Sequence, residues 1–283
     1  MLLERLIKTI PQGMSSEIIV IDDNSTQHEK ERLNYLSSQY NFKLYDNEGM
    51  YAGGARNTGL KYANGKWLLF ADADDYFTDE AEALIYKYLD SSEEIIFFNV
   101  ISKYSDTGED AYRAEHIRSI IANALQQHSL NILRCCYTAP WGKMIKRDLV
   151  EKHHIRFDEV VAGNDMMFSV LTGLRAEKVA FDMTPIYCVT VHFGSITTTL
   201  SKDKFESRFQ VTLNVNTLLK KEGYGRYQIS VLYFIGKSYQ FGIKYIIHVI
   251  HQCILHRSNP LIGIRKLLTF KSVLRDRQNL QRK

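Results

Sequence analysis

Hydrophobic and polar residues alternate through the first hundred positions in the two periods that mark strands and helices. The expected strands are short apolar runs bounded by polar residues, at positions 17–21, 42–45 and 67–71 and in a run that ends at Phe98. The expected helices have apolar residues three and four positions apart or begin at polar or glycine-rich caps, at 2–10, 26–39, 49–59 and 79–89. Strands that alternate with helices predict an α/β fold with a mostly parallel sheet.

The pattern changes after this first half. Helical spacing is clear only near 115–127 and 165–174, and residues 140–143 are expected to form a loop or the edge of a strand. From Lys202 onward, apolar and aromatic residues recur at helical spacing. We therefore expect a domain over residues 1–200 and a helical C-terminal extension over residues 201–283. The 283 residues, 45% hydrophobic and 24% charged, suit a globular chain of that size.

Charge and cysteine content exclude several classes of protein. The net charge of +4 is too small and too dispersed to indicate nucleic-acid binding. The four cysteines show neither zinc-ligand spacing nor a disulfide framework, and charges interrupt the start where a secretory signal would be apolar. These features predict a cytoplasmic protein. Aromatic residues interspersed with Lys and Arg after Tyr233 leave two interpretations open, peripheral contact with the inner face of the cytoplasmic membrane or a packed helical lid.

The most informative feature is an acidic cluster at the end of the third expected strand. Asp72, Asp74 and Asp75 lie within four positions, where open α/β sheets place their ligands. Packed carboxylates repel one another, and a bound Mg²⁺ or Mn²⁺ that shares its shell with substrate phosphates relieves the repulsion. A solvated turn that caps the next helix is the alternative. If the strand before Asp23 is a parallel neighbour, the two strand ends form one acidic rim, with Asp23 beside a nucleobase or ribose and Asp74 on the metal.

A glycine-rich helix start lies at residues 53–59, before the acidic cluster. Such a start exposes backbone amides, and Arg56 can bind a phosphate or carboxylate with two donors. The glycines equally suit close helix packing, and their order is not that of a dinucleotide-binding site. Asp22 has a similar alternative, because its carboxylate can hold the following turn through backbone amides.

Five runs of sequence resemble the inverting family 2 glycosyltransferases of the GT-A fold. In chain order they occupy residues 21–26, 54–60, 63–75, 141–147 and 163–168. The resemblance extends over most of residues 1–200. It implies a Rossmann-like sheet flanked by helices, and transfer of a sugar, of hexosyl type, from a nucleoside-diphosphate donor to a glycan or lipid-linked acceptor. It further implies a role in bacterial surface or capsular polysaccharide synthesis.

The resemblance also assigns roles to individual residues. It implies that Asp23, Arg56 and Asp72 bind the donor nucleotide, that Asp74 holds Mg²⁺ or Mn²⁺, and that Asp165 deprotonates the acceptor hydroxyl. One displacement without a covalent intermediate inverts the anomeric carbon. The alternative for Asp165 is a helix cap. Trp141, in the fourth run, is expected to offer an indole face to the acceptor, with a place in the core as its alternative.

Three departures from the family pattern add further expectations. Asn164 stands where the family usually has Glu, which predicts a more acidic Asp165 than the family norm. The family's first strand has no counterpart before residue 2, so the strand at 17–21 is expected to have an unpaired edge. His192 stands near a turn where an Arg is common. The competing functions are an inactive, truncated assembly subunit and a haloacid-dehalogenase-type phosphatase, which the Tyr76 position disfavours.

Overall fold

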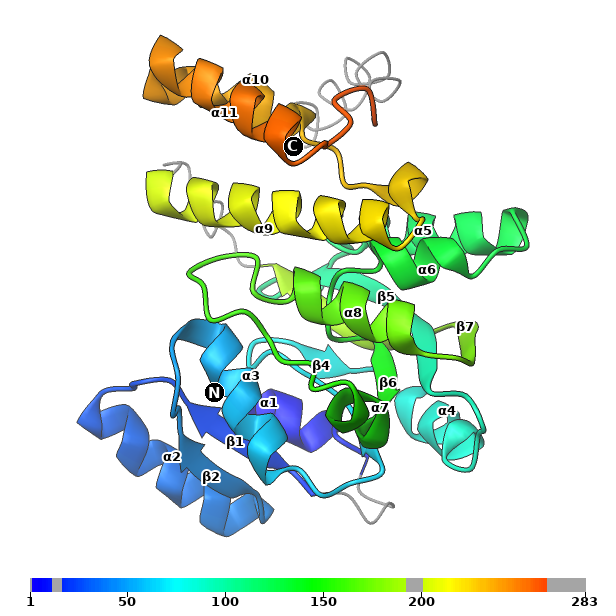
Figure 1. Ribbon diagram of the computed structural model, residues 1–283. Helices are drawn as coiled ribbons and strands as arrows, with labels where there is room; N and C mark the ends of the chain where they lie inside the picture. Colours follow the sequence, from blue (N-terminus) through cyan, green and yellow to red (C-terminus); the bar gives the residue numbers. More distant parts are fainter. Residues whose placement is uncertain (1, 12–16, 192–200, 264–283) are drawn as a thin grey trace. The chain divides into compact units, whose positions relative to one another are not determined.

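The computed structural model describes residues 2–11, 17–191 and 201–263 and divides the chain into two compact units, residues 1–200 and 201–283. His192 and the following expected turn at 194–197 lie outside the described residues. Figure 1 shows strands and helices in the first unit and helices in the second, as an α/β chain with a helical extension requires.

The first unit begins with a two-stranded parallel sheet and its helices. After α1 (Leu2–Thr9), β1 (Ile19–Asp22) pairs with β2 (Lys43–Asp46), and α2 (Gln27–Tyr40) connects the strands. A capping box between Thr26 and Glu29 starts α2, so the expected polar cap is confirmed. Among the described residues, β1 pairs with β2 alone, which agrees with the expected unpaired edge.

A separate five-stranded sheet has the order β3-β6-β5-β7-β4. Its strands, in chain order, are β3 (Trp67–Leu68), β4 (Tyr76–Phe77), β5 (Ile95–Tyr104), β6 (Lys143–Lys146) and β7 (Val179–Val191). The long pair β5 and β7 is parallel, whereas the other three pairs are antiparallel. The sequence predicted a mostly parallel sheet. The two parallel pairs, β1 with β2 and β5 with β7, have longer registers than the three antiparallel pairs, but the strands form two sheets and the larger one is mixed.

The condition for a single acidic rim is not met by the strand pairing. The strand before the acidic cluster is not a parallel neighbour of β1, because β3 is only two residues long and pairs antiparallel with β6, at Trp67 opposite Lys146. The two strand ends therefore belong to different sheets. The local pattern cannot distinguish these pairings, because both give the strand the same apolar run.

Helices of the first unit surround the sheets (Figure 1). Besides α1 and α2 they are, in chain order, α3 (Tyr51–Tyr62), α4 (Ala81–Tyr88), α5 (Glu115–Gln126), α6 (Asn131–Cys136), α7 (Arg147–Lys152) and α8 (Met166–Arg175). The first four residues of the central strand β5 are buried, with Ile95, Ile96 and Phe98 at 0% exposure. Burial of this strand gives the functional loops a rigid support.

The second unit consists of α9 (Lys202–Lys221), α10 (Leu232–Lys237), α11 (Ile243–Leu255) and two short 3-10 turns, at Gly225–Tyr227 and Ser238–Phe241. Its core is aromatic. The Phe205 ring lies 5.3 Å from that of Phe234 and 5.2 Å from that of Phe241. No described helix is both long enough and apolar enough to cross a bilayer.

Candidate active site

The loop after β3 directs its carboxylates to different places. The amide of Asp75 donates to the carbonyl of Asp72 over 3.0 Å, which closes a tight turn. The Asp75 carboxylate points into the protein and accepts hydrogen bonds from the Tyr187 hydroxyl (2.9 Å) and the Thr190 amide (2.7 Å). Burial raises the pKa of Asp75 to about 7. Asp75 therefore holds the loop, and the half-buried Asp72 and Asp74 remain as candidates for ligand contact.

Strand β7 holds the backbone of this loop. The Tyr187 hydroxyl accepts from the Asp72 amide (2.8 Å), and the Thr190 hydroxyl donates to the Asp74 carbonyl (2.5 Å). The Arg5 guanidinium of α1 donates to the same carbonyl. Sequence reasoning did not identify Arg5, Tyr187 or Thr190 as supports of the site. Each lies 69 or more positions from the loop residue that it contacts, so no local spacing indicated its role.

Trp141 lies beneath this support instead of on an open surface. Its side chain is only 9% exposed, and its ring stacks on that of Tyr187 with 5.6 Å between centroids and 14° between planes. The expected exposed sugar platform is therefore wrong, and the core alternative is correct. Burying the indole against Tyr187 removes apolar area from water and fixes the ring whose hydroxyl holds the acidic loop.

Arg56 joins the two parts of the site. Its guanidinium donates to the Asp72 carboxylate (2.7 Å) and to the side-chain oxygen of Asn164 (2.8 Å), and it lies over the ring of Phe157 at 5.5 Å from the centroid. The two hydrogen bonds connect the acidic loop with the residue next to Asp165 across about a hundred positions of sequence. The Arg56 side chain is mostly buried, so both bonds form in a partly desolvated site.

The helix that carries Arg56 also positions the segment before Asp165. The Asn57 side chain donates to the carbonyl of Phe157 (3.0 Å) and accepts from its amide (2.8 Å). Gly53 permits the close approach, because a Cβ there would lie 2.0 Å from the carbonyl oxygen of Asp158. Gly53 therefore allows close packing of the helix, which was the alternative to a phosphate-binding role for these glycines. The Met50 amide at the helix start donates to the Glu159 carboxylate, within the chain itself.

Asp165 occupies the N-cap position of α8, but its side chain makes no capping hydrogen bond. The helix-cap alternative therefore does not account for the carboxylate. Burial raises the pKa of Asp165, and the Arg56 and Lys143 charges lower it in part. A raised pKa favours a carboxylate that accepts a proton during reaction. The comparison with a family norm that Asn164 suggested stays a prediction.

Lys143 is a buried cation close to this group. Its ammonium donates to the carbonyl of Tyr137 (2.7 Å) and lies over the Tyr137 ring at 4.6 Å and the Phe97 ring at 5.3 Å from the centroids. Burial lowers the pKa of Lys143 to about 7, and the Asp165 charge opposes the shift. The sequence indicated the segment around Lys143 but gave no role to this side chain.

The β1 end of the site contains one structural and one exposed carboxylate. Asp22 is buried, accepts from the Ser25 amide (3.2 Å) and lies 3.4 Å from the Lys30 ammonium, so the turn-holding alternative agrees with the structure. Asp23 is exposed and accepts from the side chain of Asn47 (2.7 Å). Asp23 is therefore connected to the start of α3, through Asn47, and not directly to Asp72.

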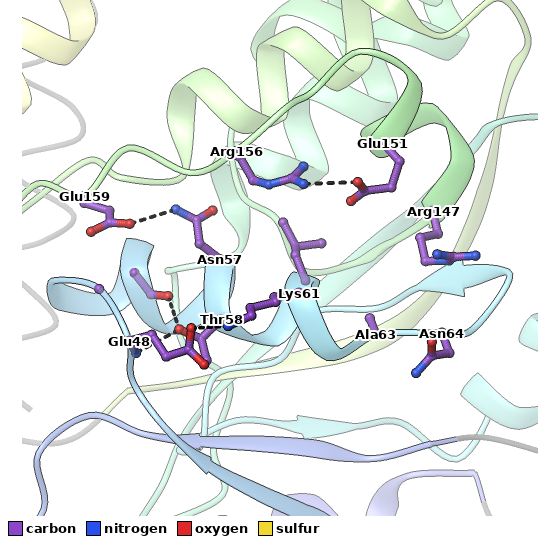
Figure 2. A pocket seen from close by; sticks show the side chains of 13 residues that line it. Glu48, Asn57, Thr58, Lys61, Ala63, Asn64, Arg147, Glu151, Arg156 and Glu159 are labelled. Atoms are coloured by element: carbon purple, nitrogen blue, oxygen red, sulfur yellow. Dashed lines mark hydrogen bonds and ion pairs between the residues drawn. The ribbon is translucent and has the colours of Figure 1, made fainter.

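A pocket of about 590 Å³ lies along the side of α3 that faces α7. Figure 2 shows its polar lining, in which Lys61 pairs with Glu48 (2.6 Å) and Arg156 with Glu151 (3.1 Å). The lining includes none of the five residues predicted to bind donor, metal or acceptor proton. Because four of its charged side chains pair with each other and none of the predicted site residues lines it, we assign the chemistry to the Arg56-linked groups and not to this pocket.

The acidic loop fits a metal ion only when a ligand completes the shell. The described residues contain no group of three or more Asp, Glu, His or Cys side chains that could hold a metal. Mg²⁺ and Mn²⁺, however, are often held by one or two carboxylates plus substrate phosphates. Asp72 and Asp74 provide hard oxygen atoms of this kind, whereas Asp75 is turned inward. The donor set thus suits a cation shared with a phosphorylated ligand.

Comparisons with known proteins give a consistent result. A family model described as Glycosyl transferase family 2 matches residues 2–153, which is more than half of the chain. The chain is 26% identical over 247 residues to the cholesterol galactosyltransferase of Borreliella burgdorferi, covering 78% of this chain and 66% of that protein. It is 23% identical over 206 residues to the EpsH protein of Bacillus subtilis, covering 68% and 57%.

A solved structure supports the fold. Residues 1–349 of Staphylococcus aureus TarS, crystallised with UDP-GlcNAc, align with a TM-score of 0.61 and 16% identity over 90% of this chain and 77% of that one. The α/β fold of GT-A type with helices after it is thereby confirmed. The chain spans 57% to 66% of the length of the two curated relatives.

Proposed function

This chain belongs to glycosyl transferase family 2, and we propose that it transfers a sugar, of hexosyl type, from a nucleoside-diphosphate donor to a hydroxyl of a glycan or lipid-linked acceptor. The transfer inverts the anomeric carbon and contributes to bacterial surface or capsular polysaccharide. The proposal assigns Asp165 as the base, Asp23, Arg56 and Asp72 to the donor nucleotide, and Asp74 to a metal ion.

The observation that carries the proposal is the Arg56 connection. Two hydrogen bonds of 2.7 and 2.8 Å place the carboxylate of Asp72 and the neighbour of Asp165 on one guanidinium. An inverting transfer needs donor-binding groups and a base that face the same reacting carbon. The connection links a proposed donor-binding group with the residue next to the proposed base, although the two are far apart in sequence.

The reaction requires one displacement. Asp165 accepts the proton of the acceptor hydroxyl, and the oxygen forms a bond to the anomeric carbon from the face opposite the nucleoside diphosphate. The bond from this carbon to the diphosphate oxygen breaks as the new bond forms, and the nucleoside diphosphate leaves with the electron pair. The raised pKa of Asp165 increases its affinity for the proton at the transition state.

The residues of the acidic loop support the donor side of the reaction. Asp74 would hold Mg²⁺ or Mn²⁺ together with the diphosphate, beside Asp72 on the donor nucleotide, and the cation when bound would neutralise charge that develops on the leaving group. Asp23, exposed beside Asn47, can accept hydrogen bonds from a base or ribose. The nucleotide of the TarS complex makes UDP and UDP-sugars the first ligands to test.

The test combines ligand binding with turnover. Thermal shifts are measured with nucleoside diphosphates and their sugars, with and without Mn²⁺, because a ligand that binds only the folded state raises its melting temperature. Release of nucleoside diphosphate is then followed for wild type and Asp165→Asn. Asp148→Asn is the matched control, because Asp148 lies on α7 with 94% of its side chain exposed.

The outcomes separate the competing functions. A metal-dependent shift that Asp74→Ala removes, with turnover that Asp165→Asn removes and Asp148→Asn retains, supports the proposal. Donor binding without turnover in every variant supports a non-catalytic assembly subunit. Release of phosphate from a phosphomonoester, with no sugar transfer, would indicate the phosphatase alternative.

A further inference from the structure

Helix α11 presents a row of isoleucines to solvent. Ile243, Ile247, Ile250 and Ile254 follow the spacing i, i+4, i+7 and i+11, which places all four on one face of the helix. Their exposed fractions are 71%, 64%, 42% and 69%. Contiguous exposed apolar side chains of this kind indicate a surface that contacts something other than water. We call these four residues the isoleucine stripe.

Another face of α11 packs into the second unit and so keeps the isoleucine stripe turned outward. Val249 and Cys253 are buried in the second unit, and the Tyr245 ring lies 5.2 Å from the ring of Phe241. Among the aromatic residues of this segment, Phe234 and Phe241 pack around Phe205, whereas Tyr233 and Tyr239 are exposed. The helix is anchored by one face, and the isoleucine stripe remains at the surface of its unit.

Charge distinguishes this part of the chain from the rest. Residues 223–283 contain eleven Lys and Arg and a single acid, Asp276, whereas residues 1–222 contain 25 Lys and Arg and 31 acids. Lys244, His248 and His251 are exposed on the flank of α11 beside the stripe. An apolar helix face bordered by cations is typical of helices that lie in the interface of an anionic bilayer.

The same charge argues against a second copy as the occupant. The described residues 223–263 contain four Lys and Arg and no acid, so two copies meeting through the stripe would bring like charges together without an acidic partner, and their repulsion would oppose the gain from apolar burial. An anionic lipid surface attracts both features at once. We propose that the isoleucine stripe of α11 inserts into the headgroup and acyl boundary of an anionic membrane, with the helix parallel to the surface and its Lys and His side chains at the phosphates.

This inference rests on the proposed function in one respect: membrane binding would bring the enzyme to lipid-linked acceptors. The experiment uses no donor or acceptor, so it can fail while sugar transfer succeeds, or the reverse. The full chain is mixed with phosphatidylcholine vesicles or with vesicles that also contain phosphatidylglycerol, and bound protein is separated by flotation.

Two variants make the test specific. Ile247→Glu/Ile254→Glu changes two exposed side chains of the stripe, and Tyr112→Glu changes a 61% exposed aromatic residue of the first unit as the control. Circular dichroism and melting temperature establish that both variants fold. Wild type and the control are expected to bind phosphatidylglycerol vesicles, and the double variant to bind roughly a hundredfold more weakly, because each isoleucine contributes about tenfold when buried.

Three results would overturn the proposal. The first is absence of wild-type binding to anionic vesicles. The second is equal binding of wild type and the double variant, since the contact would then lie elsewhere on the chain. The third is a wild-type dimer in light scattering that the double variant converts to a monomer while neither binds vesicles, which would make a second copy the occupant.

Discussion

Replacing Asn57 tests whether α3 positions the segment that leads to the base. Asn57→Ala removes two hydrogen bonds with the Phe157 backbone, at 2.8 and 3.0 Å, and a more exposed one to Glu159 at 3.2 Å. A net contribution of about 1 kcal/mol for each partly buried bond gives a loss of roughly 2 kcal/mol. For a unit of about 200 residues this loss lowers the melting temperature by roughly 4 to 8 °C.

The effect on turnover should exceed the effect on stability. The Asp158 amide donates to the Asn164 carbonyl, so release of this segment at Phe157 also frees the approach to Asp165. A displacement of the base by about 1 Å reduces the rate by roughly a hundredfold. Nucleoside diphosphate release is measured at a temperature where wild type and variant are both fully folded, with saturating donor.

Two further variants isolate the cause. Asn57→Asp retains the acceptor for the Phe157 amide but loses both donated bonds and repels Glu159, so we expect a melting temperature at or below that of Asn57→Ala. Asn34→Ala, an exposed position on α2, is the control and should resemble wild type. If Asn57→Ala melts within about 1 °C of wild type, or turns over at the wild-type rate, the segment does not depend on Asn57 and the reasoning is wrong.

Three other predictions follow from burial and close contact. Gly53→Ala should strongly destabilise the first unit in chemical denaturation, because the new Cβ would lie 2.0 Å from the Asp158 carbonyl oxygen, which is backbone. The acidic limb of the pH–rate profile should lie above the pKa of an ordinary aspartate, because burial raises the pKa of Asp165; Lys143→Met should move it still higher by removing a charge that lowers that pKa. The pKa of Asp75 is raised to about 7, so the folded state binds its proton more tightly than the unfolded state, and this contribution to stability is lost as pH rises from about 4 to 7. The unfolding free energy of wild type minus that of Asp75→Asn should therefore fall over this pH window, and a constant difference would contradict the assignment.

Local pattern was sufficient for much of the fold. The capping box at Thr26 and the apolar runs that became β1 and β2 are encoded within a few residues, so their types were predicted close to their observed bounds. The helical second unit was likewise predicted from its spacing.

The candidate residues of the site were also found from sequence, but their partners were not. Neighbouring carboxylates look alike in a sequence, yet Asp75 turns toward Tyr187, whereas Asp72 pairs with Arg56. Trp141 reads equally well as a surface platform or as a core residue until the position of Tyr187 is known.

Sequence by itself therefore determined the α/β class, the acidic loop and the cationic C-terminal segment, since periodicity, caps and charge are properties of neighbouring residues. The choice of Asp165 as the base candidate came from the family resemblance. Tertiary structure alone decided the pairing of β3 with β6, the inward turn of Asp75, the link from Arg56 to Asn164 and the outward direction of the isoleucine stripe. These features depend on contacts between elements distant along the chain. Their geometry is set by packing of the whole unit, which no short window of sequence contains.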